Sequence, residues 1–198
     1  LDHVDDVELD ERGFVAALQL RARGRTEVEL VIDCSGFRGL IINKALGEPF
    51  ESYADAMPND TALAVQIPHA EFDRLEPATR STALKAGWSW RVPLYHRVGT
   101  GYVFSSAHAT VEEATREFLD HLGMKEGEVE PRAIKMRIGR TRRPWVKNCV
   151  AIGLSSGFVE PLESTAIFAV DMAIRWLCEY FPESDFPEAV SARYNRNL

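Results

Sequence analysis

The sequence has little cysteine and lacks the spacings that would make cysteine a scaffold or a metal ligand. Its three cysteines, Cys34, Cys149 and Cys178, lie far apart, with no CxxC pair and no paired histidine spacing. Zinc sites and disulfide frameworks both need such spacings. We therefore expect no metal site. We expect each cysteine to be a small buried apolar residue, in a protein of a reducing, cytoplasmic compartment.

Long apolar runs and an excess of basic charge are also missing. No run is long enough to span a bilayer, and the start does not read as a signal peptide. The formal net charge is −7 and the one basic run, Arg137–Arg143, is short, so it is better interpreted as a solvated strand end than as a phosphate-binding strip. We expect neither a membrane nor a nucleic acid as partner.

Two further absences concern chemistry. The five histidines form no cluster in the sequence, so none is nominated for catalysis. A GxGxxG dinucleotide-binding loop is missing, and the chain opens on Leu1 as if in the middle of an element. We therefore expect this chain to be a fragment of a longer protein.

The residues that are present predict a strand-rich fold with a substantial core. Hydrophobic residues make up 45% of the chain, and short alternating segments are separated by glycine and charged turns. The first three segments predict a meander and the next three an antiparallel sheet. The predicted strands are 5–9, 14–20, 27–32, 61–68, 87–93, 101–106 and 133–138.

Helices are predicted in four places. Thr110 and Glu113 form a capping-box pattern that opens a helix reaching about His121. A short helix is predicted at 40–46, and a long one at 163–181, ending before Pro182. Another helix begins after Pro187.

Three segments could carry chemistry, and each has a structural alternative. The loop Asp33–Gly39 suits close approach to a phosphate or ribose, because glycine lacks a Cβ; residue types alone slightly favour the alternative, an ordinary strand-to-helix turn capped by Ser35. Trp88 and Trp90 lie two apart in a predicted strand and so share one face, as a wall or as core aromatics. Pro93 should end that strand or lie at a sheet edge, since it has no N–H.

The third segment is Gly153–Thr165, a turn between a buried apolar strand and a long helix. Glu160 precedes a proline and so disfavours helix, whereas Glu163 lies near the helix start. Glu163 could act as a base or stabilise a cation, and helix N–H groups could bind a small anion. A helix end capped by favourable charge is the alternative.

Six segments together resemble the flavin-dependent halogenases, most closely the tryptophan halogenases. The most specific are the Trp-x-Trp motif and Phe-Val-Glu-Pro-Leu-Glu-Ser-Thr. The resemblance extends from Asp33 to Phe181. Its segments are Asp33–Gly39, Ile42–Ala45, Gly87–Pro93, Gly99–Ser106, Arg137–Arg140 and Phe158–Thr165.

The resemblance implies an α+β fold, part of an FAD-dependent monooxygenase-like α/β flavoprotein, mostly antiparallel sheet with a long helix after the Phe-Val-Glu-Pro-Leu-Glu-Ser-Thr motif. It implies one partial domain over residues 1–198. Residues 1–40 would be the meander and the strand on the FAD side. Residues 41–145 would be the substrate-side sheet with helices, and residues 146–198 the FAD and halide loop with the following helix.

The implied activity is halogenation of tryptophan or a related indole with reduced FAD, oxygen and chloride or bromide. A separate flavin reductase would supply reduced FAD, and a homodimer is compatible with the family. Hypohalous acid would pass a wall formed by Trp88 and Trp90, in the motif that Pro93 closes. It would reach a lysine that in the family lies upstream of Leu1.

Site residues follow by position in the family motifs. Glu163 would be catalytic, orienting the halogenating species or accepting the ring proton, and with Ser164 it would bind the aromatic substrate. The N–H groups of Thr165 and Ala166 would hold the halide, although many relatives have glycine in place of Ala166. The residues implied to bind the cofactor are Asp33, Ser35, Gly36, Gly153 and Pro161.

Two alternatives to a halogenase stay open. One is a flavin monooxygenase relative without halide use, which the Trp-x-Trp pair disfavours because a monooxygenase needs substrate near its flavin. The other is a non-catalytic remnant of the fold, since the glycine-rich loop and the lysine are not in this chain.

Overall fold

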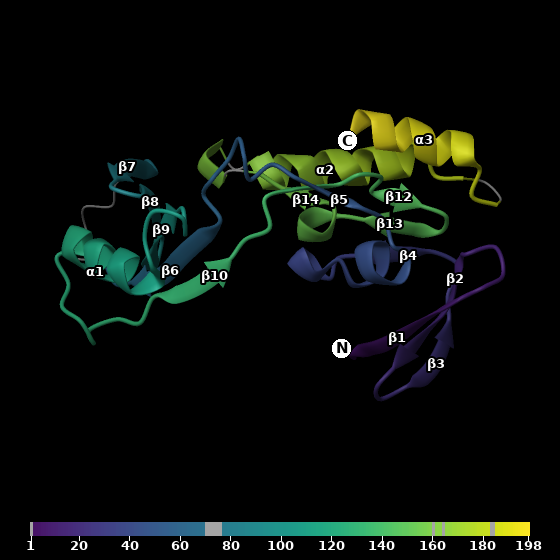
Figure 1. Cartoon of the computed structure of the whole chain (residues 1–198), viewed down its shortest axis with the longest axis horizontal. Coiled ribbons are helices and arrows are strands. Elements are labelled where there is room, and N and C mark those ends of the chain that lie inside the picture. The colour runs from purple at the N-terminus through teal and green to yellow at the C-terminus, as the bar shows by residue number, and fades with distance from the viewer. Residues whose placement is uncertain (1, 70–76, 160, 164, 183–184) are drawn as a thin grey trace. The chain divides into compact units, whose positions relative to one another are not determined.

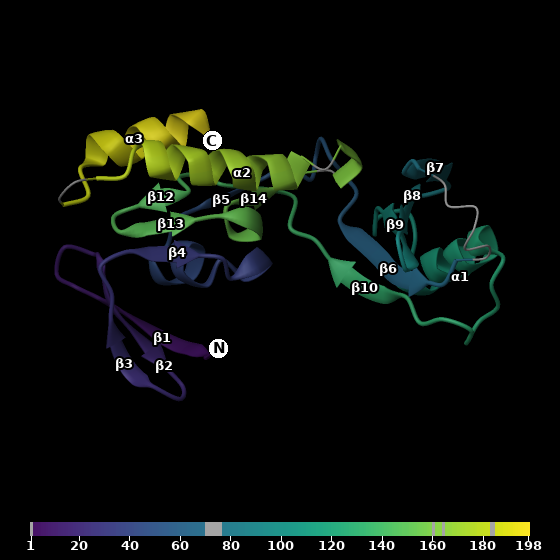
Figure 2. The same ribbon diagram turned by 180° about the vertical axis from the view of Figure 1, so that it is seen from behind.

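The computed structural model describes residues 2–69, 77–159, 161–163, 165–182 and 185–198, and of Glu163 the backbone only. Contacts divide the chain into two compact units. The first unit contains Leu1–Ser52 and Gly139–Leu198, and the second contains Tyr53–Ile138. Figures 1 and 2 trace the chain by colour from opposite sides. The sequence-based division placed its boundaries at residues 41 and 145, so the middle segment expected from sequence is longer at both ends than the second unit.

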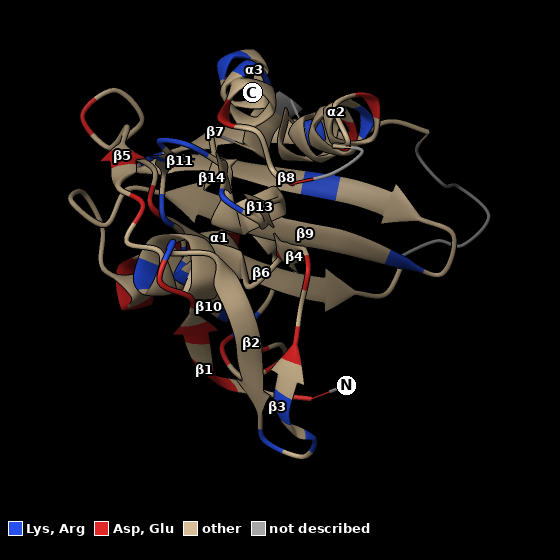
Figure 3. Ribbon diagram, turned by 90° about the vertical axis from the view of Figure 1, so that its right-hand side faces the viewer, with Lys and Arg blue, Asp and Glu red and all other residues tan. Residues whose placement is uncertain are grey.

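The first unit begins with an antiparallel meander, β1 (Val4–Leu9), β2 (Val15–Leu20) and β3 (Gly24–Glu27). The third strand expected at 27–32 is wrong. Gly24, with φ of 71°, pairs directly with Leu20 and starts β3 early. The chain then leaves the meander, and Val31–Asp33 (β4) joins another sheet. Ion pairs join Arg21, just after β2, with Asp5 of β1, and Arg25 of β3 with Glu8 of β1; Figure 3 colours the charged positions of the meander on the ribbon.

Two three-stranded sheets complete the first unit. One has the order β12 (Trp145–Val146), β13 (Cys149–Ala151), β4, and its β4 and β13 run parallel. The other has the order β14 (Gly157–Phe158), β11 (Gly139–Thr141), β5 (Phe50–Ser52). These strands have two or three residues each, too few to show an alternation in the sequence.

Alternate residues of β13 enter two cores. Cys149 and Ala151 pack with residues of β2, β4 and the π-helix Leu40–Ala45 (η2), which confirms the short helix expected at 40–46. Val150 packs with α2 (Thr165–Glu179) and α3 (Glu188–Asn197). The two helices lie along one face of this sheet in Figures 1 and 2. The helix predicted after Pro187 is confirmed.

The long helix α2 is shorter than the predicted 163–181. Pro161–Glu163 form a separate 3-10 turn (η4), so the α-helix starts at Thr165. It ends at Glu179, ahead of Pro182, which lacks an N–H for a helix. Glu163 therefore precedes the α-helix rather than belonging to its first turn.

The second unit is a five-stranded antiparallel sheet covered by one helix. Its order is β10 (Arg132–Lys135), β6 (Thr61–Ile67), β9 (Arg97–Phe104), β8 (Gly87–Leu94), β7 (Arg80–Leu84). The sequence missed β7, and the strand predicted from Gly101 starts four residues earlier, at Arg97. The mostly antiparallel α+β fold is confirmed.

Helix α1 (Val111–Leu122) packs on one face of this sheet. Phe118 and Ala114 contact a core that contains Leu63, Tyr102 and Phe104. The predicted capping box is present, since Thr110 accepts from the backbone N–H of Glu113 and the Glu113 carboxylate accepts from that of Thr110. This cap fixes where the helix starts.

Two expectations about burial and span can be compared with the structure. Cys149 is buried, but Cys34 and Cys178 are exposed, so the expectation of three buried cysteines is wrong for those two. Among the residues described, no helix is both long and apolar enough to cross a membrane.

Candidate functional site

Two glycine-led turns lie side by side in the first unit. Strands β4 and β13 are parallel neighbours, and the Ile152 N–H donates to the Asp33 carbonyl at 3.1 Å just where both strands end. They continue into the 3-10 turns Gly36–Arg38 (η1) and Gly153–Ser155 (η3), which contact each other. The carboxyl ends of neighbouring parallel strands are where ligands bind in α/β sheets.

Asp33 fixes the first of these loops from inside. Its carboxylate is 1% exposed and accepts three backbone N–H groups, from Ser35 at 2.9 Å, Ile41 at 3.0 Å and Ile42 at 2.8 Å. The Ser35 hydroxyl accepts from the Leu40 N–H at 2.6 Å. Both side chains therefore shape the loop and cap η2. Direct contact of Asp33 or Ser35 with a cofactor stays a prediction.

The two turn glycines offer bare backbone. Gly36 has φ of 74° and Gly153 φ of 75°, a region that favours glycine. A Cβ built on Gly36 would meet no atom within 4 Å, and one on Gly153 only Val170 Cγ2 at 3.8 Å. The space over both turns is therefore open to a ligand, which fits the phosphate or ribose of a nucleotide cofactor.

The second turn is held by buried hydroxyl groups that the sequence reading missed. Ser155 is fully buried, and its hydroxyl donates to the Asp33 carbonyl. The Ser155 carbonyl accepts from the Thr141 hydroxyl at 2.7 Å, and that hydroxyl accepts from Asn43 Nδ2 at 3.1 Å. Nothing in the sequence separates these serine, threonine and asparagine side chains from surface polar residues.

The chain then enters the segment predicted to bind halide. β14 pairs with β11, and Phe158 meets Phe37 of the first turn edge-to-face with ring centroids 5.5 Å apart. Thr165 is exposed and Ala166 half-buried, and they are the first two residues of α2. The first four N–H groups of a helix lack intrahelical acceptors, so this end can bind an anion.

Some predicted site residues can be placed only in part. Pro161 lies in η4, together with the backbone of Glu163. Glu160, Ser164 and the Glu163 side chain lie outside the described residues. The roles assigned to Glu163 and Ser164 therefore stay predictions.

Trp88 and Trp90 lie in the second unit and share one face of β8. Their ring centroids are 6.1 Å apart and their planes tilted by 59°. Both are half-buried, whereas Ser89 between them is 2% exposed and pairs with Tyr102 of the α1 core. The two indoles therefore lie on the face opposite that core, as their spacing predicted, and their role as a wall stays a prediction.

The neighbouring strand accommodates Trp90 closely. Trp90 pairs with Gly101, and a Cβ at Gly101 would lie 2.1 Å from Trp90 Cη2 and 2.3 Å from the Leu63 carbonyl oxygen. The indole therefore occupies the space that any side chain at 101 would need. From the other face, the Thr100 hydroxyl donates to the Trp90 carbonyl at 2.6 Å.

Pro93 lies where β8 has lost one neighbour. Among the described residues, β7 pairs with β8 only from Gly87 to Arg91, and Val92–Leu94 pair with β9 alone. A missing N–H costs little on that unpaired side. Pro93 therefore lies at a local sheet edge, as expected, and the strand ends one residue later at Leu94.

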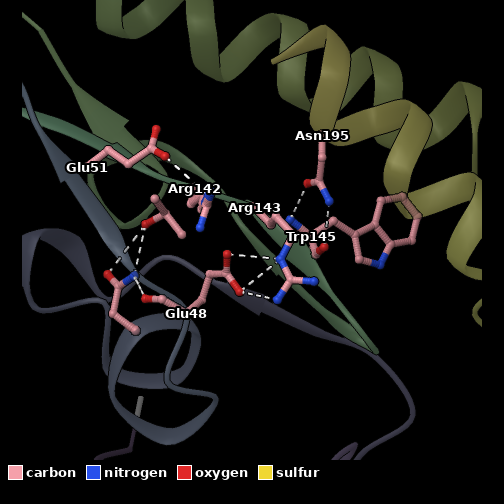
Figure 4. Close-up of polar contacts among 8 residues, drawn as sticks. Glu48, Glu51, Arg142, Arg143, Trp145 and Asn195 are labelled. Atoms are coloured by element: carbon pink, nitrogen blue, oxygen red, sulfur yellow. Dashed lines mark hydrogen bonds and ion pairs between the residues drawn. The ribbon is translucent and has the colours of Figure 1, made fainter.

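The basic run is paired with acidic side chains. Arg143 contacts the buried Glu48 through both Nε and Nη2, the latter at 2.6 Å from Oε2 (Figure 4). This hydrogen bond to Glu48 raises the pKa of Arg143. Arg140 and Arg142 contact Glu51 at 3.1 and 3.4 Å. The solvated strand end thus describes this run better than a phosphate-binding strip.

Neither Cys34 nor Cys149 is prepared for nucleophilic chemistry. Burial, with a smaller contribution from Asp33, raises the pKa of both the Cys34 and the Cys149 thiol. Each therefore stays protonated near neutral pH. Within the described residues, no group of three or more histidine, cysteine or acidic side chains is placed to hold a metal ion.

Comparison with known proteins places this chain in a family. The tryptophan halogenase family matches residues 1–198. The chain belongs to that family. Tryptophan 6-halogenase SttH of Streptomyces toxytricini is 47% identical over 98% of this chain, and tryptophan 7-halogenase RebH of Lentzea aerocolonigenes is 46% identical over 100%. The chain covers 38% of SttH and 37% of RebH.

Solved structures of halogenases share the fold. The crystal structure of SttH matches with a TM-score of 0.94 and 47% identity, over 99% of this chain and 39% of that chain. BrvH, a flavin-dependent halogenase from Brevundimonas sp. BAL3, matches with a TM-score of 0.91 and 46% identity, over 98% of this chain and 40% of that chain. The chain thus spans about two fifths of the length of these tryptophan halogenases and their relatives.

Proposed function

We propose that the protein carrying this chain halogenates tryptophan or a related indole, using reduced FAD, oxygen and chloride or bromide. The observation that carries the proposal is the pair of open, positive-φ glycine turns at neighbouring strand ends, in a chain of the tryptophan halogenase family. A reductase supplies reduced FAD, the compartment is cytoplasmic, and a homodimer is compatible with the proposal.

The first unit holds the cofactor and the halide. The backbone of Gly36 and Gly153 approaches the FAD, with Pro161 beside it and with Asp33 and Ser35 shaping the loop. Bound reduced FAD, with oxygen, supplies the oxidising power that converts halide to hypohalous acid. The N–H groups of Thr165 and Ala166 hold the halide at the α2 N-terminus, where the helix dipole favours an anion.

Glu163 and Ser164 face the substrate in this proposal. Electrophilic halogenation replaces a ring hydrogen, so a proton must leave the cationic ring. The Glu163 carboxylate accepts that proton or orients the halogenating species. The Trp88–Trp90 wall keeps the indole from the flavin while the small oxidant passes.

The test is a product assay of the protein that carries this chain, with reduced FAD, air, chloride or bromide, and a panel of indoles. Mass spectrometry should find a product heavier by one halogen less one hydrogen, with the isotope pattern of that halogen, and no such product when halide is omitted. A hydroxylated indole would instead identify a flavin monooxygenase. FAD binding without any turnover would indicate a remnant.

The wall can be tested separately with the double variant Trp88→Ala, Trp90→Ala. We expect faster consumption of reduced flavin without product, measured as hydrogen peroxide released per halogenated indole. The matched control is Tyr95→Ala, an aromatic in the same hairpin that is 79% exposed. An unchanged ratio in the double variant would mean that the indoles form no barrier.

A further inference from the structure

We propose that Thr141 and Ser155 are positioning residues for the flavin, which hold the turns η3 and η1 at one fixed spacing. This inference rests on the proposed function, because it concerns the cofactor that those turns would hold. Neither residue touches the open face of the turns. They act through a chain of buried hydrogen bonds from Asn43 through Thr141 and Ser155 to Asp33, here called the polar link.

The polar link connects four segments that are distant in the sequence. Asn43 lies in η2, Thr141 in β11, Ser155 in η3, and Asp33 at the end of β4. Asn43 Nδ2 also donates to the Glu48 carbonyl at 2.9 Å, and the Thr141 N–H donates to the Ser156 carbonyl at 2.6 Å. The C-terminal end of η3, at Ser155 and Ser156, is therefore tied both to β11 and to the end of β4.

Because the hydroxyl groups of the polar link are buried, their hydrogen bonds indicate what these residues do. Thr141 and Asp33 are each 1% exposed and Ser155 is 0% exposed. A hydroxyl buried without a partner is costly, and valine would fill the same space as threonine with no such requirement. What threonine adds is a donor for the Ser155 carbonyl, and a buried carbonyl needs one. The link therefore defines the geometry of the turn rather than adding apolar packing.

The same bonds set the distance between the two glycine turns. The Ser155 hydroxyl donates to the carbonyl of Asp33, whose carboxylate holds the Ser35 N–H that opens the Gly36 turn. If this connection loosens, Gly153 and Gly36 no longer keep one spacing. A ligand that contacts both backbones then binds more weakly, since part of its binding energy is spent on ordering them.

The experiment compares oxidised-FAD affinities in the protein that carries this chain, measured by flavin fluorescence titration well below each variant's melting temperature. Thr141→Val should raise the FAD dissociation constant by at least ~10-fold, equivalent to about 1.4 kcal/mol. Thr141→Ser, which restores the hydroxyl, should stay within ~3-fold of wild type. KM for FAD should rise in the valine variant while KM for the indole is unchanged.

Ser155→Ala provides a second variant that removes only one oxygen, and it should weaken FAD binding in the same direction. Ser156→Ala is its matched control, since that neighbouring hydroxyl has no part in the polar link. A Thr141→Val protein with a lowered melting temperature and wild-type FAD affinity would overturn the inference alone. A wild-type protein that binds no FAD would overturn the proposed function together with it.

Discussion

The two units of the chain differ in how their backbones present the candidate site residues. In the first, the strands and 3-10 turns around the site have two or three residues each, and they are fixed by buried carboxylate, hydroxyl and amide groups. In the second, a regular five-stranded ladder carries Trp88 and Trp90 with little help from polar side chains. Irregular backbone presents N–H groups to a ligand, whereas a regular sheet presents side chains on a defined face.

The difference shows where each unit is vulnerable. A turn that lacks ladder partners depends on single side-chain bonds, so the loss of one group changes its geometry. A sheet distributes its bonds over many residues and is most sensitive to bulk, as at Gly101 beneath Trp90. Each of the following substitutions either removes one side-chain group or adds bulk at one position, and each acts within a single unit.

The largest effect is expected at Glu163, in the first unit. Glu163→Gln removes a positioned base or charge, which typically costs ~100-fold to ~10,000-fold in rate. Halogenated product per minute should fall by that range while FAD still binds. Glu160→Gln is the control and should matter less. Equal losses in both variants would mean that the catalytic role has been assigned to the wrong carboxylate.

Added bulk in the second unit comes next. Gly101→Ala places a Cβ 2.1 Å from Trp90 Cη2 and 2.3 Å from a backbone oxygen, so we expect a loss of about 3 kcal/mol in the free energy of unfolding. Gly99→Ala is the control on the same strand and face, where an added Cβ would lie 3.9 Å from the Val92 carbonyl oxygen, and it should change stability by less than about 0.5 kcal/mol. Denaturant unfolding measures both, and similar midpoints would refute the tight contact.

A smaller effect is expected at the ion pair of the first unit. Arg143→Met leaves the Glu48 carboxylate, 4% exposed, without its bidentate partner, and should cost about 2 kcal/mol of unfolding free energy. Arg142→Met is the adjacent control, because the side chains of Arg142 and Glu51 are 65% and 39% exposed; it should cost less than about 1 kcal/mol. Equal costs would show that burial of Glu48 does not matter.

The smallest effect is expected at Tyr102, in the second unit. Its hydroxyl accepts from the Ala86 N–H and donates to Glu117, each at 3.0 Å, and Tyr102→Phe should cost about 1 kcal/mol near neutral pH. Burial, with the bond to Glu117, raises the pKa of Tyr102 from 10.0 to about 12.

The raised pKa also gives a direction for the pH dependence. The neutral phenol is favoured by folding, so its contribution is complete below pH 10 and is lost as the pH rises toward about 12. Unfolding measured at about pH 9 and about pH 11 should show a smaller alkaline loss in Tyr102→Phe than in wild type. Tyr95→Phe, at an exposed tyrosine, should keep the wild-type loss.

The sequence predicted the regular parts of both units because their signals are local. The Thr110 capping box, the shared face of Trp88 and Trp90, and the helix after Pro187 each depend on a few neighbouring residues. The buried strand before Gly153 was predicted and is β13. The β3–β4 division could not be predicted, since Val31 of β4 pairs with Cys149, more than a hundred residues away. The strands β5, β11, β12 and β14 are too short to show an alternation.

The candidate site was predictable only where glycine or a family motif marked it. Gly36 and Gly153 were identified, and the structure places their turns together. Thr141 and Ser155 were not, because burial of a hydroxyl is a property of the fold and leaves no local pattern. Asp33 was predicted to bind the cofactor. In the structure its carboxylate accepts from backbone N–H groups up to nine residues away, at the start of η2, which no local pattern indicates.

The Trp88–Trp90 geometry has an optical consequence. Two indoles 6.1 Å apart and tilted by 59° are a chiral pair of chromophores whose electronic transitions couple. Such a pair gives circular dichroism bands of opposite sign that vanish when either indole is replaced. The Trp88–Trp90 pair is therefore an intrinsic spectroscopic probe of the hairpin. The circular dichroism bands that are lost in Trp88→Phe would be the bands of this pair. Folding of the second unit could then be followed apart from Trp145 and Trp176, which belong to the first.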